Sequence, residues 1–200
     1  MEAKTAKSEM TRAAIVDAAL DIAASHGMRA LSMQAVADRL HISKSGVFSR
    51  SGSLEALQQA VLDEYGRRFV ARIFAPAMQK AKGLERLNEM VRRWLEQICH
   101  QSGIGGSLYE ATAFSIDPVE QTLHDSLAGR VRDWRSAVRR TIVQAVSQCE
   151  LRAGLDPDQF NYELHCLFIG ALYEANFLKD PKTEERAMLA YRRLLEGYRP

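Results

Sequence analysis

The spacing of apolar residues in the C-terminal half of the chain is the strongest constraint on its fold. One series recurs at steps of four, four, three, four, four, three and four residues: Leu123, Leu127, Val131, Trp134, Val138, Ile142, Ala145 and Cys149. Such steps keep side chains on one face of an α-helix, as in a helix packed along a bundle. No segment alternates polar and apolar residues between hairpin turns. We therefore expect an all-α protein with about nine helices in total.

The composition is that of an ordinary folded protein. The 200 residues are 46% hydrophobic and 26% charged, which suits one sizeable core or two small ones. The longest apolar stretch, Cys166–Tyr173, is too short to span a bilayer. The polar N-terminal segment MEAKTAKSEMTR lacks the apolar core of a signal peptide, and three widely spaced cysteines indicate no disulfide framework. We therefore expect a cytoplasmic protein with no membrane partner.

Two short helices are predicted near the N-terminus, separated by a tight turn. Ser32 and Ser43 can each cap a helix, and each follows an apolar residue placed to form a hydrophobic staple. The first of these helices ends by Leu40-His41, so few residues remain before the second begins. This spacing is typical of a helix-turn-helix. A preceding helix from about Thr11 to Ser25 completes a compact three-helix unit.

Positive charge is concentrated in this N-terminal region. Residues 29–50 contain four basic residues and one acid, a net charge of +3, whereas the whole chain carries +2. In a helix-turn-helix, a short exposed helix enters the major groove of DNA. The segment after Ser43 suits that role because its side chains are mostly small, polar or basic. The candidate DNA-binding residues are Ser32, Gln34, Ser43, Lys44, Ser45, Gly46, Phe48 and Arg50.

These residues also resemble a known family, the TetR family of transcriptional repressors. The resemblance covers roughly the first quarter of the chain. It is carried by TRAAIVDAA (11–19), Gly27, LSMQAVA (31–37), ISKSGVF (42–48) and GSLEAL (52–57). The resemblance implies a dimeric regulator that binds a palindromic operator on double-stranded DNA and is released by a small-molecule effector. It also implies a helix-turn-helix domain over residues 1–52 and a ligand-binding and dimerisation domain over 53–200.

Several positions depart from the family pattern. The family usually ends its recognition helix with an aromatic residue, any residue, His and Phe, where this chain has Phe48-Ser49-Arg50-Ser51. Leu54 stands where the family often has Lys, and His41 stands where Gly is common. His tolerates a left-handed backbone better than most residues. An alternative therefore stays open: a helical ligand-binding or interaction protein with weak or lost operator binding.

The remainder of the chain is predicted to form a larger helical bundle. Helix starts with a cap and a proline are predicted at Asp117-Pro118, Asp156-Pro157 and Asp180-Pro181, and Gly103–Gly106 is predicted as a loop. A pocket between bundle helices is the usual place for a small apolar ligand. The candidate ligand-binding residues are Trp94, Tyr109, Phe114, Trp134 and Phe168.

The helix from Asp156 to about Phe177 is apolar on two sides. One side can pack in its own domain, and the other can pack on a second copy, because Gly170 allows close approach. We therefore expect a homodimer. Its candidate interface residues are Cys166, Gly170, Tyr173, Phe177, Met188, Tyr191 and Leu195.

The sequence does not indicate an enzyme, a metal site or a cofactor. None of the five histidines has a second His four residues away, and HExxH, GxSxG and P-loop motifs are absent. Cys99-His100 and His165-Cys166 are adjacent pairs whose side chains would lie on different faces of a helix, which is poor geometry for binding one metal ion.

Overall fold

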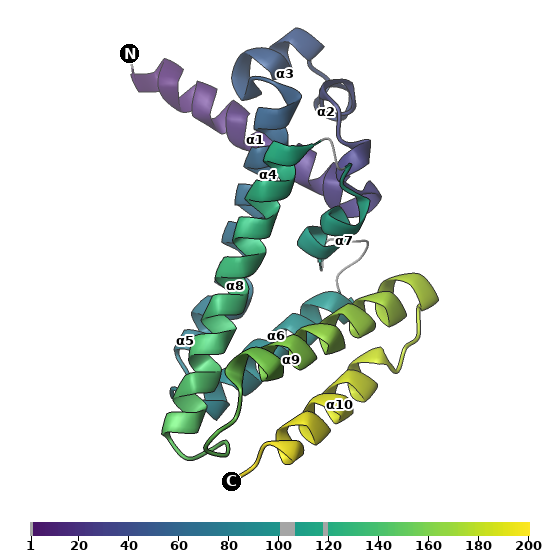
Figure 1. Cartoon of the computed structure of the whole chain (residues 1–200). Coiled ribbons are helices and arrows are strands. Elements are labelled where there is room, and N and C mark those ends of the chain that lie inside the picture. The colour runs from purple at the N-terminus through teal and green to yellow at the C-terminus, as the bar shows by residue number, and fades with distance from the viewer. Residues whose placement is uncertain (1, 101–106, 118–119) are drawn as a thin grey trace. The chain divides into compact units, whose positions relative to one another are not determined.

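The computed structural model describes residues 2–100, 107–117 and 120–200, with side chains from residue 12 onward (Figure 1). These residues form helices, turns and connecting loops, with no strand among them, so the all-α prediction is confirmed. No helix in this part of the chain combines the length and apolar character needed to cross a membrane.

The helices follow one another with short connections. Their bounds are α1 (Glu2–His26), α2 (Met33–Leu40), α3 (Lys44–Ser51), α4 (Leu54–Phe69), α5 (Ala75–Met78), α6 (Leu84–His100), α7 (Leu108–Ser115), α8 (Gln121–Ser147), α9 (Pro157–Tyr173) and α10 (Thr183–Gly197). A 3₁₀ turn, η1 (Met28–Ala30), follows α1, and π-helical turns η2 (Val70–Phe74) and η4 (Glu174–Leu178) follow α4 and α9.

The chain divides into two compact units. Unit 1 comprises Met1–Arg68 and Ser102–Ala128, and unit 2 comprises Phe69–Gln101 and Gly129–Pro200. Helices α4 and α8 therefore each contribute to both units. The predicted helix start at Asp117-Pro118 lies partly outside the described residues, and the predicted loop Gly103–Gly106 lies wholly outside them.

The core of unit 1 follows the helical spacing of the sequence. On α1 the buried stripe is Ile15, Ala18, Ala19 and Ala23; α2 adds Met33, Val36 and Ala37, and α4 adds Leu57, Val61 and Tyr65. Helix α7 also belongs to this unit. The ring of its Tyr109 meets the ring of Tyr65 edge-on, with centroids 4.7 Å apart.

In unit 2 a proline changes the winding of the chain after α4. Pro76 has no N–H to donate to the carbonyl four residues earlier, that of Arg72. A π turn, η2, covers this stretch before the α-helix resumes as α5, so the helical path from Leu54 runs on to Met78. With α5 counted as the continuation of α4, the described residues contain the predicted nine α-helices.

Helices α6, α8 and α9 supply most of the core of unit 2. In the apolar series of α8 only Val131 and Cys149 are not buried: Val131 is half-buried, and Cys149 lies in the turn beyond the helix end. Helix α9 begins as predicted, with Asp156 accepting from the N–H groups of Asp158 and Gln159. Leu155 and Phe160 on either side of that cap are both buried. Helices α9 and α10 lie side by side (Figure 1).

Candidate DNA-binding surface and ligand site

The turn between α2 and α3 has the geometry expected from its sequence. His41 adopts the left-handed conformation, with φ 55° and ψ 42°. This reversal lets the N–H of Ile42 reach the carbonyl of Ala37 at 3.0 Å, which closes the end of α2. Few L-residues other than Asn, Asp and His adopt this conformation readily, so His41 makes the turn possible without a glycine.

Both predicted N-caps are present. Ser32 Oγ accepts from the N–H of Ala35, and Ser43 Oγ accepts from the N–H of Gly46, each at 3.1 Å. In the stapled pair of α2, Leu31 and Val36 are both buried, but Ile42 before α3 is 37% exposed. The start of α3 therefore depends more on its serine cap than on apolar contact.

Helix α3 presents most of its surface to solvent. Val47 is its buried residue, whereas Phe48 is 60% exposed. Lys44, Ser45 and Arg50 are also exposed, and α3 contains no acid. An exposed, acid-free helix on a buried anchor has the character needed to enter the major groove.

The polar side chains on this surface differ in how freely they can reach a ligand. Arg50 Nη1 donates to the carbonyl of Gly46 at 2.8 Å, and Gln34 Nε2 donates to Asp38 Oδ1 at 2.7 Å. Within the described residues, the ammonium of Lys44 makes no hydrogen bond or ion pair. Lys44 is therefore the cation of α3 that meets an incoming phosphate without first giving up a contact.

The departures from the family pattern have local structural consequences. Ser51 Oγ donates to the carbonyl of Val47 at 2.9 Å and lies 3.9 Å from Met33 Sδ. The hydroxyl of the half-buried Ser51 is thus hydrogen-bonded within its own helix, and Met33 lies beside it. Leu54 at the start of α4 is 38% exposed and offers no charge there.

The five candidate ligand-binding residues divide into three groups. Trp94, Trp134 and Phe168 lie together in unit 2: the two indole rings are 4.4 Å apart and nearly perpendicular, and Phe168 is 3.6 Å from Trp94. Tyr109 is buried in unit 1, where its hydroxyl bonds to the carbonyl of Leu62. Phe114 is 75% exposed. Within one unit, the structure therefore brings together Trp94, Trp134 and Phe168.

The structure adds residues that the sequence analysis missed. Arg135, Asn161 and His165 line the cavity beside the two indole rings. Helical spacing could have indicated two of them, because Arg135 is the neighbour of Trp134 and His165 precedes Phe168 by almost one turn. Burial lowers the pKa of His165, and the nearby charge of Arg135 lowers it further.

The candidate dimer residues lie mostly on an exposed face of α9 and η4. Tyr173 and Phe177 are 54% and 70% exposed, with rings 5.1 Å apart, and Cys166 and Gly170 are also exposed. Met188 and Leu195 on α10 are half-buried.

Tyr191 requires a correction because it lies inside its own unit. It is 2% exposed, and its hydroxyl donates to Asn88 Oδ1 at 2.8 Å. A side chain buried against α6 has no surface left for a second copy.

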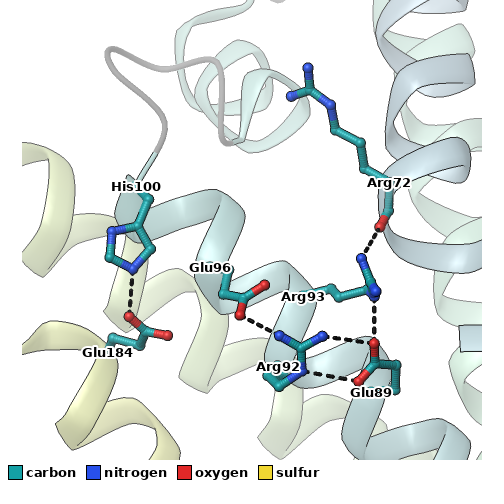
Figure 2. Close-up of polar contacts among 7 residues, drawn as sticks. All are labelled: Arg72, Glu89, Arg92, Arg93, Glu96, His100 and Glu184. Carbon is teal, nitrogen blue, oxygen red and sulfur yellow. Dashed lines mark hydrogen bonds and ion pairs between the residues drawn. The ribbon is translucent and has the colours of Figure 1, made fainter. Parts of the chain in front are cut away.

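A polar network follows the outer face of α6 (Figure 2). Glu89 accepts from Arg92 at 2.7 and 3.0 Å and from Arg93 at 2.6 Å. Arg93 also donates to the carbonyl of Arg72 at 3.3 Å, the group that Pro76 cannot reach. Hydrogen bonds from Arg92 are the main reason that the pKa of Glu89 falls to about 2. At the end of α6, His100 Nε2 lies 2.7 Å from Glu184 on α10.

Cysteine and possible metal-ligand side chains were the other candidates for a reactive site. Burial raises the pKa of the Cys99 thiol to about 11, which disfavours the reactive thiolate. In the part of the chain that the structure describes, no three His, Cys, Asp or Glu side chains are grouped to hold a metal ion.

Two family models match the sequence. One, described as a tetracyclin repressor-like C-terminal domain, matches residues 83–191. The other, described as bacterial regulatory proteins of the tetR family, matches residues 15–61. Among curated proteins, none matches this chain.

Solved structures share the fold over almost the whole length. A TetR-family transcriptional regulator from Cytophaga hutchinsonii has a TM-score of 0.82 at 17% identity, with 96% of each chain covered. A TetR transcriptional regulator from Chloroflexus aurantiacus has a TM-score of 0.82 at 20% identity, covering 95% of this chain and 94% of that one. AibR, solved with isovaleryl coenzyme A and operator DNA, has a TM-score of 0.70 at 17% identity, covering 92% and 95%.

Proposed function

Because this chain belongs to the TetR family of bacterial regulatory proteins, we propose that it is a homodimeric repressor released from a palindromic operator by a small effector. The observation that carries the proposal is the surface of α3. This helix is anchored by Val47, exposes Lys44 and Phe48, and contains no acid.

Each part of this surface has a role in the proposal. Lys44 and Arg50 contact phosphates, which supply affinity without sequence preference. Ser45 and Phe48 face base edges, where an exposed aromatic ring suits the methyl group of thymine. Ser32, Gln34, Ser43 and Gly46 border the same helices, and their backbone allows close approach to the DNA. Residues 1–52 form the DNA-binding domain in this proposal.

Residues 53–200 form the ligand-binding and dimerisation domain. The aromatic cluster of Trp94, Trp134 and Phe168 is the effector site that we favour. AibR, which has a similar fold, was solved in complex with isovaleryl coenzyme A and operator DNA, and this supports a chain that binds both a small molecule and an operator. Coupling requires the effector to bind one of two dimer geometries more tightly than the other.

A second copy would pack against α9 and α10. Tyr173 and Phe177 place two exposed aromatic rings on one face, and Gly170 leaves room for a neighbouring helix. In a two-fold symmetric dimer bound to DNA, two copies of α3 on successive major grooves would lie roughly 34 Å apart. This arrangement implies a palindromic operator, and a DNA-binding repressor of this kind works in the cytoplasm.

The experiment is a selection of bound duplexes from a random DNA pool at moderate salt, using the full chain. The proposal expects enrichment of one palindromic sequence. Enrichment of no sequence above non-specific binding would favour the alternative, a helical ligand-binding or interaction protein without operator binding. A selected operator then allows the effector to be tested by release of the DNA.

A further inference from the structure

A narrow cavity, partly open to solvent, lies between α6, α8 and α9 in unit 2. Trp94 comes from α6, Trp134 and Arg135 come from α8, and His165 and Phe168 come from α9. Arg135 and His165 are half-buried, whereas both tryptophans are buried. The cavity therefore extends from the surface of the unit into its core.

The two tryptophans that line this cavity each carry a buried hydrogen-bond donor that has no acceptor among the described residues. Trp94 is 1% exposed and Trp134 is 8% exposed, and within the described residues neither indole N–H has a partner. The two rings pack edge to face. In such a pair only one ring presents its edge, so the pair supplies at most one weak N–H···π contact. Buried donors are almost always paired, and two unpaired donors on one cavity call for an acceptor.

A cation without a counterion lines the same cavity. Among the described residues, no carboxylate lies within ion-pair distance of the Arg135 guanidinium. The carbonyl of Arg135 accepts from Asn161 Nδ2 at 3.0 Å, which joins α8 to α9 at this point. Since burial and the charge of Arg135 both lower the pKa of His165, its imidazole is neutral near pH 7.

Water cannot satisfy these donors, because the cavity is too narrow to hold a water molecule. A ligand must therefore displace a side chain to enter. Phe168 contacts Trp94 with ring centroids 3.6 Å apart, and Arg135 lies at the half-exposed end. Movement of these two side chains would open a path from the surface to the indole rings.

We propose that this cavity binds a small monocarboxylate with an apolar body. The carboxylate accepts hydrogen bonds from the indole N–H groups and pairs with Arg135, and the apolar body packs against Phe168 and its apolar neighbours. The claim that this cavity is the effector site of the regulator rests on the proposed function. The claim that it binds an acid rests only on the hydrogen-bond donors that line it.

The test uses the fluorescence of the full chain. Trp94 and Trp134 are its two tryptophans, so the whole indole signal comes from this cavity. The probes are phenylacetate and decanoate, each paired with its methyl ester. Each acid is expected to cause a saturable spectral change, with affinity at least about tenfold above that of its ester.

Variants of Arg135 test the charge contact. Arg135→Gln is expected to lower the affinity for the acids by about tenfold, with little effect on the affinity for the esters. Arg135→Lys is expected to retain part of the affinity that Arg135→Gln loses. Arg140→Gln, at an exposed position on the same helix, is the matched control and is expected to bind like the unmodified chain.

Three results would overturn the proposal: equal affinity for acid and ester, unchanged acid binding in Arg135→Gln, or no spectral change with either acid up to about 1 mM, the weak end of specific binding. Operator binding is measured separately by gel shift. Acid binding without operator binding would refute the proposed function and leave the acid site in place. Operator binding without acid binding would refute the acid site and leave the proposed function in place.

Discussion

The hydroxyl of Tyr109 donates a 2.9 Å hydrogen bond to the main-chain carbonyl of Leu62, and so joins α7 to α4. This contact depends on a glycine one turn further along α4. A Cβ on Gly66 would lie 2.5 Å from Tyr109 Oη, closer than any ordinary contact. Gly66 is therefore the residue that allows the tyrosine to reach the helix backbone.

The first prediction is that the effect of Gly66→Ala on the free energy of unfolding has opposite signs with Tyr and with Phe at position 109. In the unmodified chain, the added methyl group forces Tyr109 away, and the free energy of unfolding falls because a buried hydrogen bond worth about 1 kcal/mol is lost together with packing. In a Tyr109→Phe background the clash is absent, and the higher helix propensity of Ala raises stability by about 0.5–1 kcal/mol. Chemical denaturation of the unmodified chain, the two single variants and the double variant measures both effects. Equal effects of Gly66→Ala in the two backgrounds would contradict this account.

The contact between Tyr109 and Leu62 also shows where sequence reasoning ends. Local signals were sufficient for the helix-turn-helix, because caps at Ser32 and Ser43 and a left-handed His41 are set by residues within one or two turns. The start of α9 at Asp156 was predictable for the same reason. Tyr109 and Leu62 are 47 residues apart, and nothing in the spacing of either helix indicates that α7 packs in unit 1.

The candidate ligand site was predictable in part. Trp94, Trp134 and Phe168 each lie on the buried stripe of a helix, so their burial followed from periodicity. Periodicity does not say which buried aromatic residues share a neighbourhood, and it therefore grouped Tyr109 with residues of another unit. It also does not distinguish a stripe that faces a second copy from one that faces the same unit, as Tyr191 shows.

The second prediction concerns Glu110, which is buried on α7. Burial raises the pKa of its carboxyl group to about 7. In the unfolded chain the group loses its proton near pH 4.5, so between pH 4.5 and 7 the folded state binds more protons. The free energy of unfolding therefore falls as pH rises through this window. Glu110→Gln, which stays neutral, is expected to remove this fall and to be more stable at pH 8, by up to about 3 kcal/mol. Parallel stability curves for the two proteins would contradict the prediction.

The third prediction has the opposite sign and concerns Glu89. Hydrogen bonds from Arg92, opposed by burial and aided by Arg93, lower its pKa to about 2 (Figure 2). The stability that this carboxylate contributes is present above pH 4.5 and is lost as pH falls toward 2. Glu89→Gln is expected to lower stability by about 2 kcal/mol at pH 7, with a difference that shrinks in acid. Thermal unfolding of both proteins at a series of pH values measures this stability difference. A difference that does not change with pH would show that it does not come from the charge of Glu89.

The fourth prediction separates two cations on α3. Lys44→Ala is expected to weaken operator binding and to reduce the slope of log affinity against log salt by about one unit, since one phosphate contact is lost. Arg50→Ala is expected to have a smaller effect, because the guanidinium must first leave the carbonyl of Gly46. Gel shifts at several salt concentrations measure both slopes. Arg199→Ala, an exposed cation near the C-terminus, is the control, and an equal effect at all three positions would exclude a specific role for α3.

The last prediction concerns assembly. If a second copy covers the exposed face of α9 and η4, a charge in its centre must be buried without a partner, which is costly. Phe177→Asp and Gly170→Arg are therefore expected to convert a dimer into a monomer of about 22.4 kDa in light scattering at micromolar concentration. Phe114→Asp is the matched control, because Phe114 is 75% exposed and Phe177 is 70% exposed. General loss of apolar surface would affect both phenylalanines equally, whereas a specific interface is lost only in the variants on α9 and η4. A monomeric unmodified chain would refute the interface together with the spacing of the two α3 helices that depends on it.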